Sequence, residues 1–129
     1  MNADLLETGA VWLETQRTRY MTRRVVYQRG QESVELPATI GRTVFRVDKG
    51  YGLSERFESR DYMVLIADLV LGGAPILPKP GDQVRETEGG QVFIYEVMAP
   101  GNEPCWRYSD PFRRTYRIHA KLVATEAAP

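Results

Sequence analysis

Over most of its length the chain alternates apolar and polar residues, and turns that contain glycine separate the alternating segments. Successive side chains of a β-strand point to opposite faces of the sheet, so a period of two is typical of strands that bury one face. Residues 24–28, 33–36 and 91–97 follow this pattern, and Gly30 and residues 89–90 provide reversals between strands. The pattern therefore predicts a mostly-β protein.

Other segments refine this prediction. Residues 43–47 alternate before a glycine-containing reversal at 48–52, which predicts a further hairpin. The run from Tyr62 to Ile66 is continuously apolar, which fits either a strand covered on both faces or a short buried helix, and we favour the strand. Pro37 cannot donate to a strand ladder, so the strand that contains it should lie at an edge or end there.

The length of 129 residues favours a single domain with one core. Residues 1–20 are expected to form a helix, because Leu5, Trp12 and Leu13 recur at helical spacing. Residues 23–123 should form the β body, and residues 124–129 should fray. We therefore expect a small β-barrel or sandwich of about seven short strands with an N-terminal helix. Loops are expected at residues 51–55, 72–79 and 100–104.

The charges balance but are unevenly distributed. The chain has 17 basic and 17 acidic residues, which argues against the strongly positive surface of a dedicated nucleic-acid binder. The charged residues within 16–31 and 107–121 are mostly basic, whereas those within 82–103 are mostly acidic. These blocks are either solvated strand faces or two unlike surfaces that dock on neighbouring subunits. The candidate subunit-interface residues are Arg113, Arg114, Arg117, Asp82, Glu86, Glu88 and Glu96.

Residues with catalytic chemistry are scarce. The single cysteine excludes an internal disulfide, and one cysteine with one histidine makes a zinc site improbable. Cys105, His119 and Asp110 could nominally form a nucleophilic set, but the surrounding motifs of cysteine hydrolases are absent. Glu86 and Glu88 are interpreted as part of a solvated loop. We therefore expect neither enzymatic activity nor a cofactor.

Features of membrane and secreted proteins are also missing from the sequence. The longest mainly apolar run, residues 62–71, is far shorter than the roughly 20 residues of a membrane-spanning helix. The first residues lack the basic start and apolar stretch of a secretory signal. We therefore expect synthesis in the cytoplasm and no membrane partner.

Several segments together resemble a known family. They are residues 39–43 and 58–62, the turn and strand at 78–84, the hairpin strand at 90–97, and the paired segments 106–110 and 116–121. In these segments the chain is similar to small head-tail joining proteins, of the connector or stopper type, from tailed double-stranded DNA phages and prophages. The resemblance implies a β-barrel or sandwich subunit and carries over no catalytic residue.

The same resemblance implies a structural virion protein that forms a homo-oligomeric ring in the phage neck. Its partners would be a portal-side adaptor and tail-terminator or other tail proteins, and double-stranded DNA would pass through its lumen without specific recognition. The host bacterial cytoplasm would be its site of synthesis. One alternative within this class is a tail-terminator or minor tail subunit. An alternative from another class is a monomeric β-barrel binding module of the host.

Overall fold

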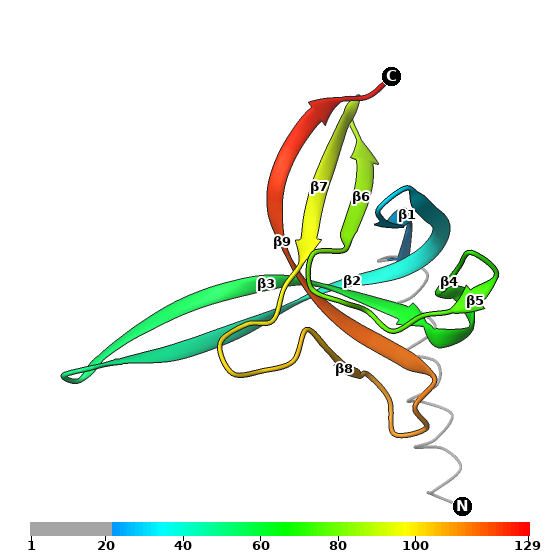
Figure 1. The fold of residues 1–129 in the computed structure, drawn as a ribbon. Coiled ribbons are helices and arrows are strands. Elements are labelled where there is room, and N and C mark those ends of the chain that lie inside the picture. Colours follow the sequence, from blue (N-terminus) through cyan, green and yellow to red (C-terminus); the bar gives the residue numbers. More distant parts are fainter. Residues whose placement is uncertain (1–21) are drawn as a thin grey trace, which may run out of the picture.

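The computed structural model describes residues 22–129, and these form almost entirely β structure (Figure 1). The strands are β1 (Thr22–Arg29), β2 (Glu32–Gly50), β3 (Leu53–Leu65), β4 (Val70–Leu71), β5 (Ala74–Pro75), β6 (Gln83–Glu88), β7 (Gln91–Val97), β8 (Trp106–Tyr108) and β9 (Thr115–Ala127). A 3₁₀ turn, Ile66–Asp68, follows β3. The mostly-β prediction is confirmed. The helix expected over residues 1–20 lies outside the described residues.

Six strands pair in a circuit that returns to its starting point. β1 pairs with β2, β2 with β3, and β3 with the first half of β9. The second half of β9 pairs with β7, β7 with β6, and β6 with β1. All these ladders are antiparallel, and β8 adds to β9 beside the circuit. Within residues 22–129, no helix is long and apolar enough to cross a membrane.

The core lies inside this circuit and is filled by the inward positions of the alternating strands. Val25, Tyr27 and Leu36 are buried, as their alternation predicts. Tyr62 and Val64 are also buried, and the residues around them form β3 as far as Leu65, which supports the strand interpretation of this segment.

Pro37 lies where β2 is locally an edge. Pro37 lies opposite Arg24 of β1, and the pairing of β2 with β3 begins only at Thr39. Because no β3 residue lies opposite Pro37, its missing donor interrupts no β2–β3 ladder. The edge prediction therefore holds only at Pro37 itself, because β2 as a whole lies between β1 and β3 and continues to Gly50.

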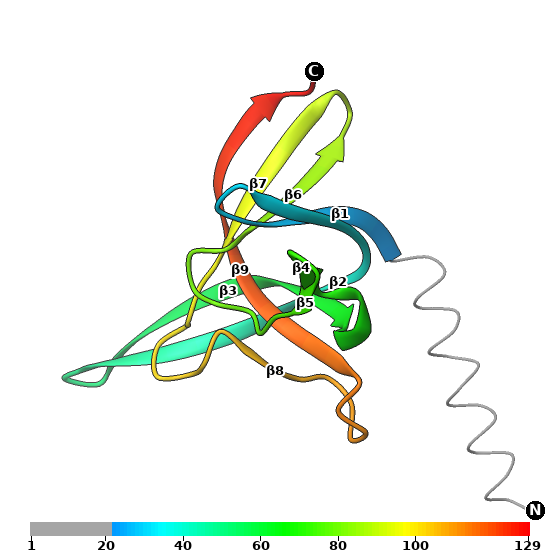
Figure 2. The same cartoon turned by 45° about the vertical axis from the view of Figure 1, so that its right-hand side comes forward.

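Beyond the core, β2 and β3 continue as a two-stranded ribbon, residues 42–58, which we call the arm (Figures 1 and 2). Near its base, the rings of Phe45 and Phe57 stack with centroids 5.3 Å apart. At the tip, Gly50 and Gly52 adopt positive φ angles, and Tyr51 between them also has a φ of 52°. The loop expected at residues 51–55 is only this tip, because β3 already begins at Leu53.

A second projection, which we call the wing, comprises β6, β7 and residues 121–127 of β9 (Figure 1). The prediction that residues 124–129 fray is wrong, because β9 continues to Ala127. Ala127 lies opposite Gln91, and the backbone N–H of Ala128 donates to the carbonyl of Gly90 over 2.9 Å. Pairing with β7 therefore orders the end of the chain. The arm and the wing leave the body in different directions (Figures 1 and 2).

Candidate assembly surfaces

The seven residues predicted to form a subunit interface fall into two groups. Asp82 and Glu86 are 4% and 3% exposed, and Arg117 is largely covered. The other four, Arg113, Arg114, Glu88 and Glu96, are exposed or half-buried. Each member of the first group is paired inside the chain, whereas the second group lies on the surface. Their role in an interface stays a prediction.

Asp82 ties the proline-rich turn before β6 to β1. Its carboxylate accepts two hydrogen bonds from the Arg29 guanidinium, at 2.8 and 2.7 Å, and another from the Tyr27 hydroxyl. The backbone N–H of Lys79 also donates to it over 3.1 Å. Burial and the hydrogen bond to Asp82 raise the pKa of Tyr27, so that its hydroxyl stays protonated and remains a donor. Asp82 therefore stabilises the turn.

Glu86 forms a second buried cluster, on β6. Arg60 of β3 donates to its two carboxylate oxygens over 2.6 and 2.8 Å, and the Tyr62 hydroxyl donates over 2.5 Å. The Arg60 guanidinium also lies over the Tyr95 ring, 5.0 Å from its centroid. The interpretation of Glu86 as part of a solvated loop is wrong, because β6 places it on the same buried face as Val84. Glu88 is exposed and pairs with Arg23 at 2.8 Å.

A third cluster surrounds Asp61, which is 0% exposed and was not among the predicted site residues. Arg117 Nε and Ser59 Oγ donate to it over 2.6 and 2.5 Å, and the Thr43 hydroxyl donates as well. His119 Nδ1 lies 2.9 Å away. Burial alone would raise the pKa of Asp61, but these hydrogen bonds hold it well below its usual range.

The Asp61 cluster fixes the base of the arm to β9. Arg117 Nη2 donates to the Arg42 carbonyl over 2.9 Å, and the Phe45 ring meets the His119 ring edge-on at 5.2 Å. Gly41 leaves little room at this junction, since a Cβ there would lie 3.0 Å from Met63 Cε. The direction of the arm is therefore set by a buried, close-packed joint.

The loop between β8 and β9, residues 109–114, presents basic and aromatic side chains. Phe112 is 76% exposed. The guanidinium groups of Arg113 and Arg114 lie over Tyr108 and Phe112, at 5.4 and 5.8 Å from the ring centroids. Asp110 Oδ1 accepts hydrogen bonds from the backbone N–H groups of Arg114 and Thr115, each at 2.9 Å. The carboxylate of Asp110 thus holds the loop in one shape.

We expect Asp110→Ala to loosen this loop while costing only about 1 kcal/mol of unfolding free energy, because one exposed and one partly buried hydrogen bond are lost. Amide hydrogen exchange should speed up at Arg114 and Thr115 and stay unchanged at Ile118. Asp110→Asn keeps one acceptor oxygen, so its exchange rates at Arg114 and Thr115 should lie between those of the wild type and of Asp110→Ala. Unchanged exchange at Arg114 in the alanine variant would contradict this role of Asp110.

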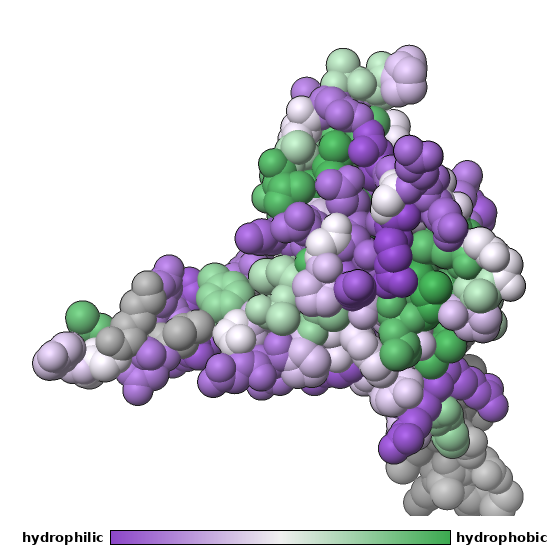
Figure 3. Space-filling view, in the orientation of Figure 1, coloured by the Kyte–Doolittle hydropathy of each residue, from purple (hydrophilic) through white to green (hydrophobic). Residues whose placement is uncertain are grey.

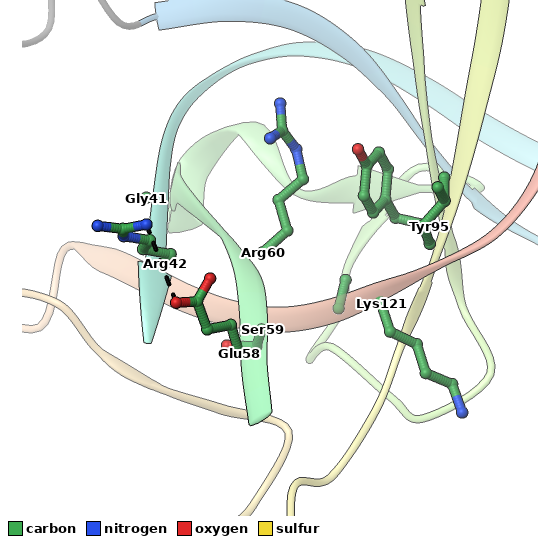
Figure 4. A pocket seen from close by; sticks show the side chains of 9 residues that line it. Gly41, Arg42, Glu58, Ser59, Arg60, Tyr95 and Lys121 are labelled. Carbon is green, nitrogen blue, oxygen red and sulfur yellow. Dashed lines mark ion pairs between the residues drawn. The ribbon is translucent and has the colours of Figure 1, made fainter. Parts of the chain in front are cut away.

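A hollow of about 330 Å³ lies where the arm and the wing diverge (Figure 4). Arg42 and Glu58 line its arm side, and Tyr95 and Lys121 line its wing side. β3 and β9 pair as far as Arg60 opposite Ala120, and beyond this pair the two strands separate. The hollow is thus the notch between two diverging strands.

The nominal catalytic residues serve the fold. Burial raises the pKa of the Cys105 thiol, and its Sγ lies 3.6 Å from the Pro78 carbonyl as a weak donor. His119 belongs to the Asp61 cluster, and Asp110 closes its own loop. Among residues 22–129, no three histidine, cysteine or acidic side chains group as a metal site would require. On the face of the molecule that Figure 3 shows, apolar areas lie on the body and on the wing.

Comparison with known families decides how these surfaces are interpreted. The model of the phage head-tail joining protein family matches residues 3–127, nearly the whole chain. The chain belongs to this family. A search of curated proteins returned no match. As a phage head-tail joining protein, the chain is a structural component of the virion neck, where it contacts head and tail proteins. The resemblance inferred from the sequence is confirmed.

Proposed function

We propose that this head-tail joining protein forms a closed ring of identical subunits, as a connector or stopper between the portal-side adaptor and the tail. The observation that carries the proposal is the family match over residues 3–127 of a chain whose described strands pair in a closed circuit. We interpret this circuit as a small β-barrel, a rigid body suited to repetition around an axis. Double-stranded DNA would pass through the ring without specific recognition.

A ring requires two different, complementary surfaces on each subunit, because every contact is head-to-tail. The basic loop at residues 109–114 and the wing, with Glu88 and Glu96, supply surfaces of unlike charge. Asp82, Glu86 and Arg117 are occupied by partners within the chain. We assign docking between subunits to the surface residues Arg113, Arg114, Glu88 and Glu96, of which Glu88 also forms an exposed ion pair with Arg23. The buried members of the predicted set keep the subunit folded.

Reversing Arg113 and Arg114 to glutamate should abolish assembly and leave the subunit folded, because both side chains are exposed and neither has an ion-pair partner within residues 22–129. Circular dichroism and the melting temperature would report folding, and electron microscopy of particles would report assembly. Arg24→Glu, which reverses the charge of an exposed side chain on β1 outside this loop, is the control and should leave assembly intact. Normal incorporation of the Arg113/Arg114 variant into particles would refute the charge-docking proposal.

A further inference from the structure

The two faces of the arm differ in what they carry. Alternate side chains of a strand point to opposite faces. On one face, Phe45 stacks on Phe57, and Ser59 donates to the buried carboxylate of Asp61. The other face consists of exposed side chains, which we call the arginine face: Arg42, Val44 and Arg46 of β2 with Arg56 and Glu58 of β3.

The charges of the arginine face are not balanced. Arg46 lies directly opposite Arg56, which places their Cβ atoms about 5 Å apart. Glu58 is the one carboxylate in this set, and it lies 3.9 Å from Arg42 and from Arg56. Arg46 has no ion-pair partner among the described residues. The centre of the face therefore keeps an excess of positive charge.

Exposed arginines on β1 are paired more closely than those of the arm. Arg23 lies 2.8 Å from Glu88, and Arg24 lies 2.8 Å from Glu35. Like charges directly opposite each other on two strands are destabilising. Charges on strand edges also prevent unwanted pairing, but charges of alternating sign would do so without this repulsion. The arginine pair of the arm therefore destabilises the isolated subunit, and a negatively charged partner would relieve the repulsion.

The composition of the arginine face fits a protein partner rather than nucleic acid. Val44 is 41% exposed and lies between Arg42 and Arg46 along β2. Protein interfaces combine apolar side chains with arginine, whose planar guanidinium binds carboxylates through two parallel hydrogen bonds. Asp48 and Glu58 lie on the same side of the arm and would repel a phosphate backbone. The expected partner is therefore a protein surface that carries carboxylates.

We propose that the arginine face binds an acidic surface of a neighbouring neck protein other than this chain. Members of this family contact head and tail proteins. The inference rests on the ring proposed above, in which the acidic wing already takes the basic loop of the next copy. The arm leaves the body in a different direction from the wing, and the Asp61 joint fixes that direction (Figures 1 and 2). The arginine face is thus held out to a second protein.

Charge reversal in the phage tests this contact. Arg46→Glu with Arg56→Glu keeps a like-charge pair on the ribbon, so the purified variant should melt at the wild-type temperature. Its rings should still form, but the fraction of heads joined to tails in electron micrographs of lysates should fall at least about tenfold, because carboxylates would then face carboxylates. The matched control, Arg46→Lys with Arg56→Lys, keeps both charges and should join several-fold better than the reversed variant.

Suppressor mutations of the reversed variant identify the partner. Joining should be restored by replacement of an acidic residue with a basic one in another neck protein. Wild-type joining by the reversed variant, with or without loss of DNA from the heads, overturns the inference. Suppressors at Glu88 or Glu96, or loss of rings, would show a contact between copies and overturn it while the proposed function stands. Absence of rings from wild-type necks overturns the proposed function itself.

Discussion

Replacing Asp61 with alanine is expected to lower the free energy of unfolding by about 3–5 kcal/mol, the largest effect of any single change considered for this chain. The carboxylate is wholly buried and accepts hydrogen bonds from Arg117, Ser59 and Thr43. Its removal leaves the largely covered Arg117 guanidinium without its counter-charge, and a buried charge without a partner is costly. Urea unfolding at pH 7 measures the loss.

Glu58, three residues earlier on the same strand, provides the matched control. Its carboxylate is about half exposed and lies 3.9 Å from Arg42 and from Arg56, so Glu58→Ala should cost less than about 1 kcal/mol. Equal effects of the two substitutions would show that the Asp61 cluster contributes no more than a surface ion pair. Asp61→Ala should also speed amide exchange along the arm base at Thr43, since the joint to β9 is broken.

The acid dependence of stability follows from the lowered pKa of Asp61. A carboxyl whose pKa is lower in the folded than in the unfolded chain binds fewer protons when folded, so its stabilisation is present above the unfolded pKa of about 3.9. It is lost as the pH falls through the folded pKa. The difference in unfolding free energy between the wild type and Asp61→Asn should therefore shrink as the pH falls below about 4.

Replacing Glu86 with alanine is expected to cost about 3 kcal/mol of unfolding free energy, the second largest effect. The change removes two hydrogen bonds from Arg60 and leaves the buried Tyr62 hydroxyl without its acceptor. Arg60 keeps its contact with the Tyr95 ring and is partly exposed, so water compensates for part of the loss. Thermal and urea unfolding of the purified protein measure the effect.

Two further variants make this prediction specific. Glu88→Ala, two residues along β6, removes an exposed ion pair with Arg23 and should cost less than about 1 kcal/mol. Tyr62→Phe should destabilise the wild type by about 1 kcal/mol. The same substitution should be neutral or stabilising in the Glu86→Ala variant, because there the Tyr62 hydroxyl has already lost its acceptor. Additive effects of Tyr62→Phe and Glu86→Ala would contradict the proposed pairing.

Local patterns predicted the β class and the hairpin turns, but not the lengths of the strands: β2 runs for 19 residues and β3 for 13, where short strands were expected. The alternation around Val25, Tyr27 and Leu36 identified the buried face of β1 and β2, and the glycine reversals at Gly30 and residues 89–90 identified two hairpins. These features depend on residues close together in the sequence, where side-chain direction follows from strand geometry. The prediction of a frayed end was wrong because residues 124–127 pair with β7, and no local sequence pattern reveals this pairing.

The buried ion pairs could not be predicted from local patterns, because their partners are far apart in the sequence. Arg60 and Glu86 are 26 residues apart, and Asp61 and His119 are 58 apart. One signal was present: continuing the alternation from Val84 places Glu86 on the buried face. A charged residue in the buried phase of a strand indicates a buried partner. Asp61 gave no such signal, since it alternates with Tyr62 and both faces of β3 are covered there.

The proposed ring requires many copies of this chain around one axis at the junction of head and tail. Electron microscopy of purified particles, with the protein labelled by a bound antibody fragment, tests this requirement directly. We expect a closed ring of label coaxial with the tail, between the portal and the first tail ring. Label at a single off-axis position, or particles with complete necks that contain none of the protein, would contradict it.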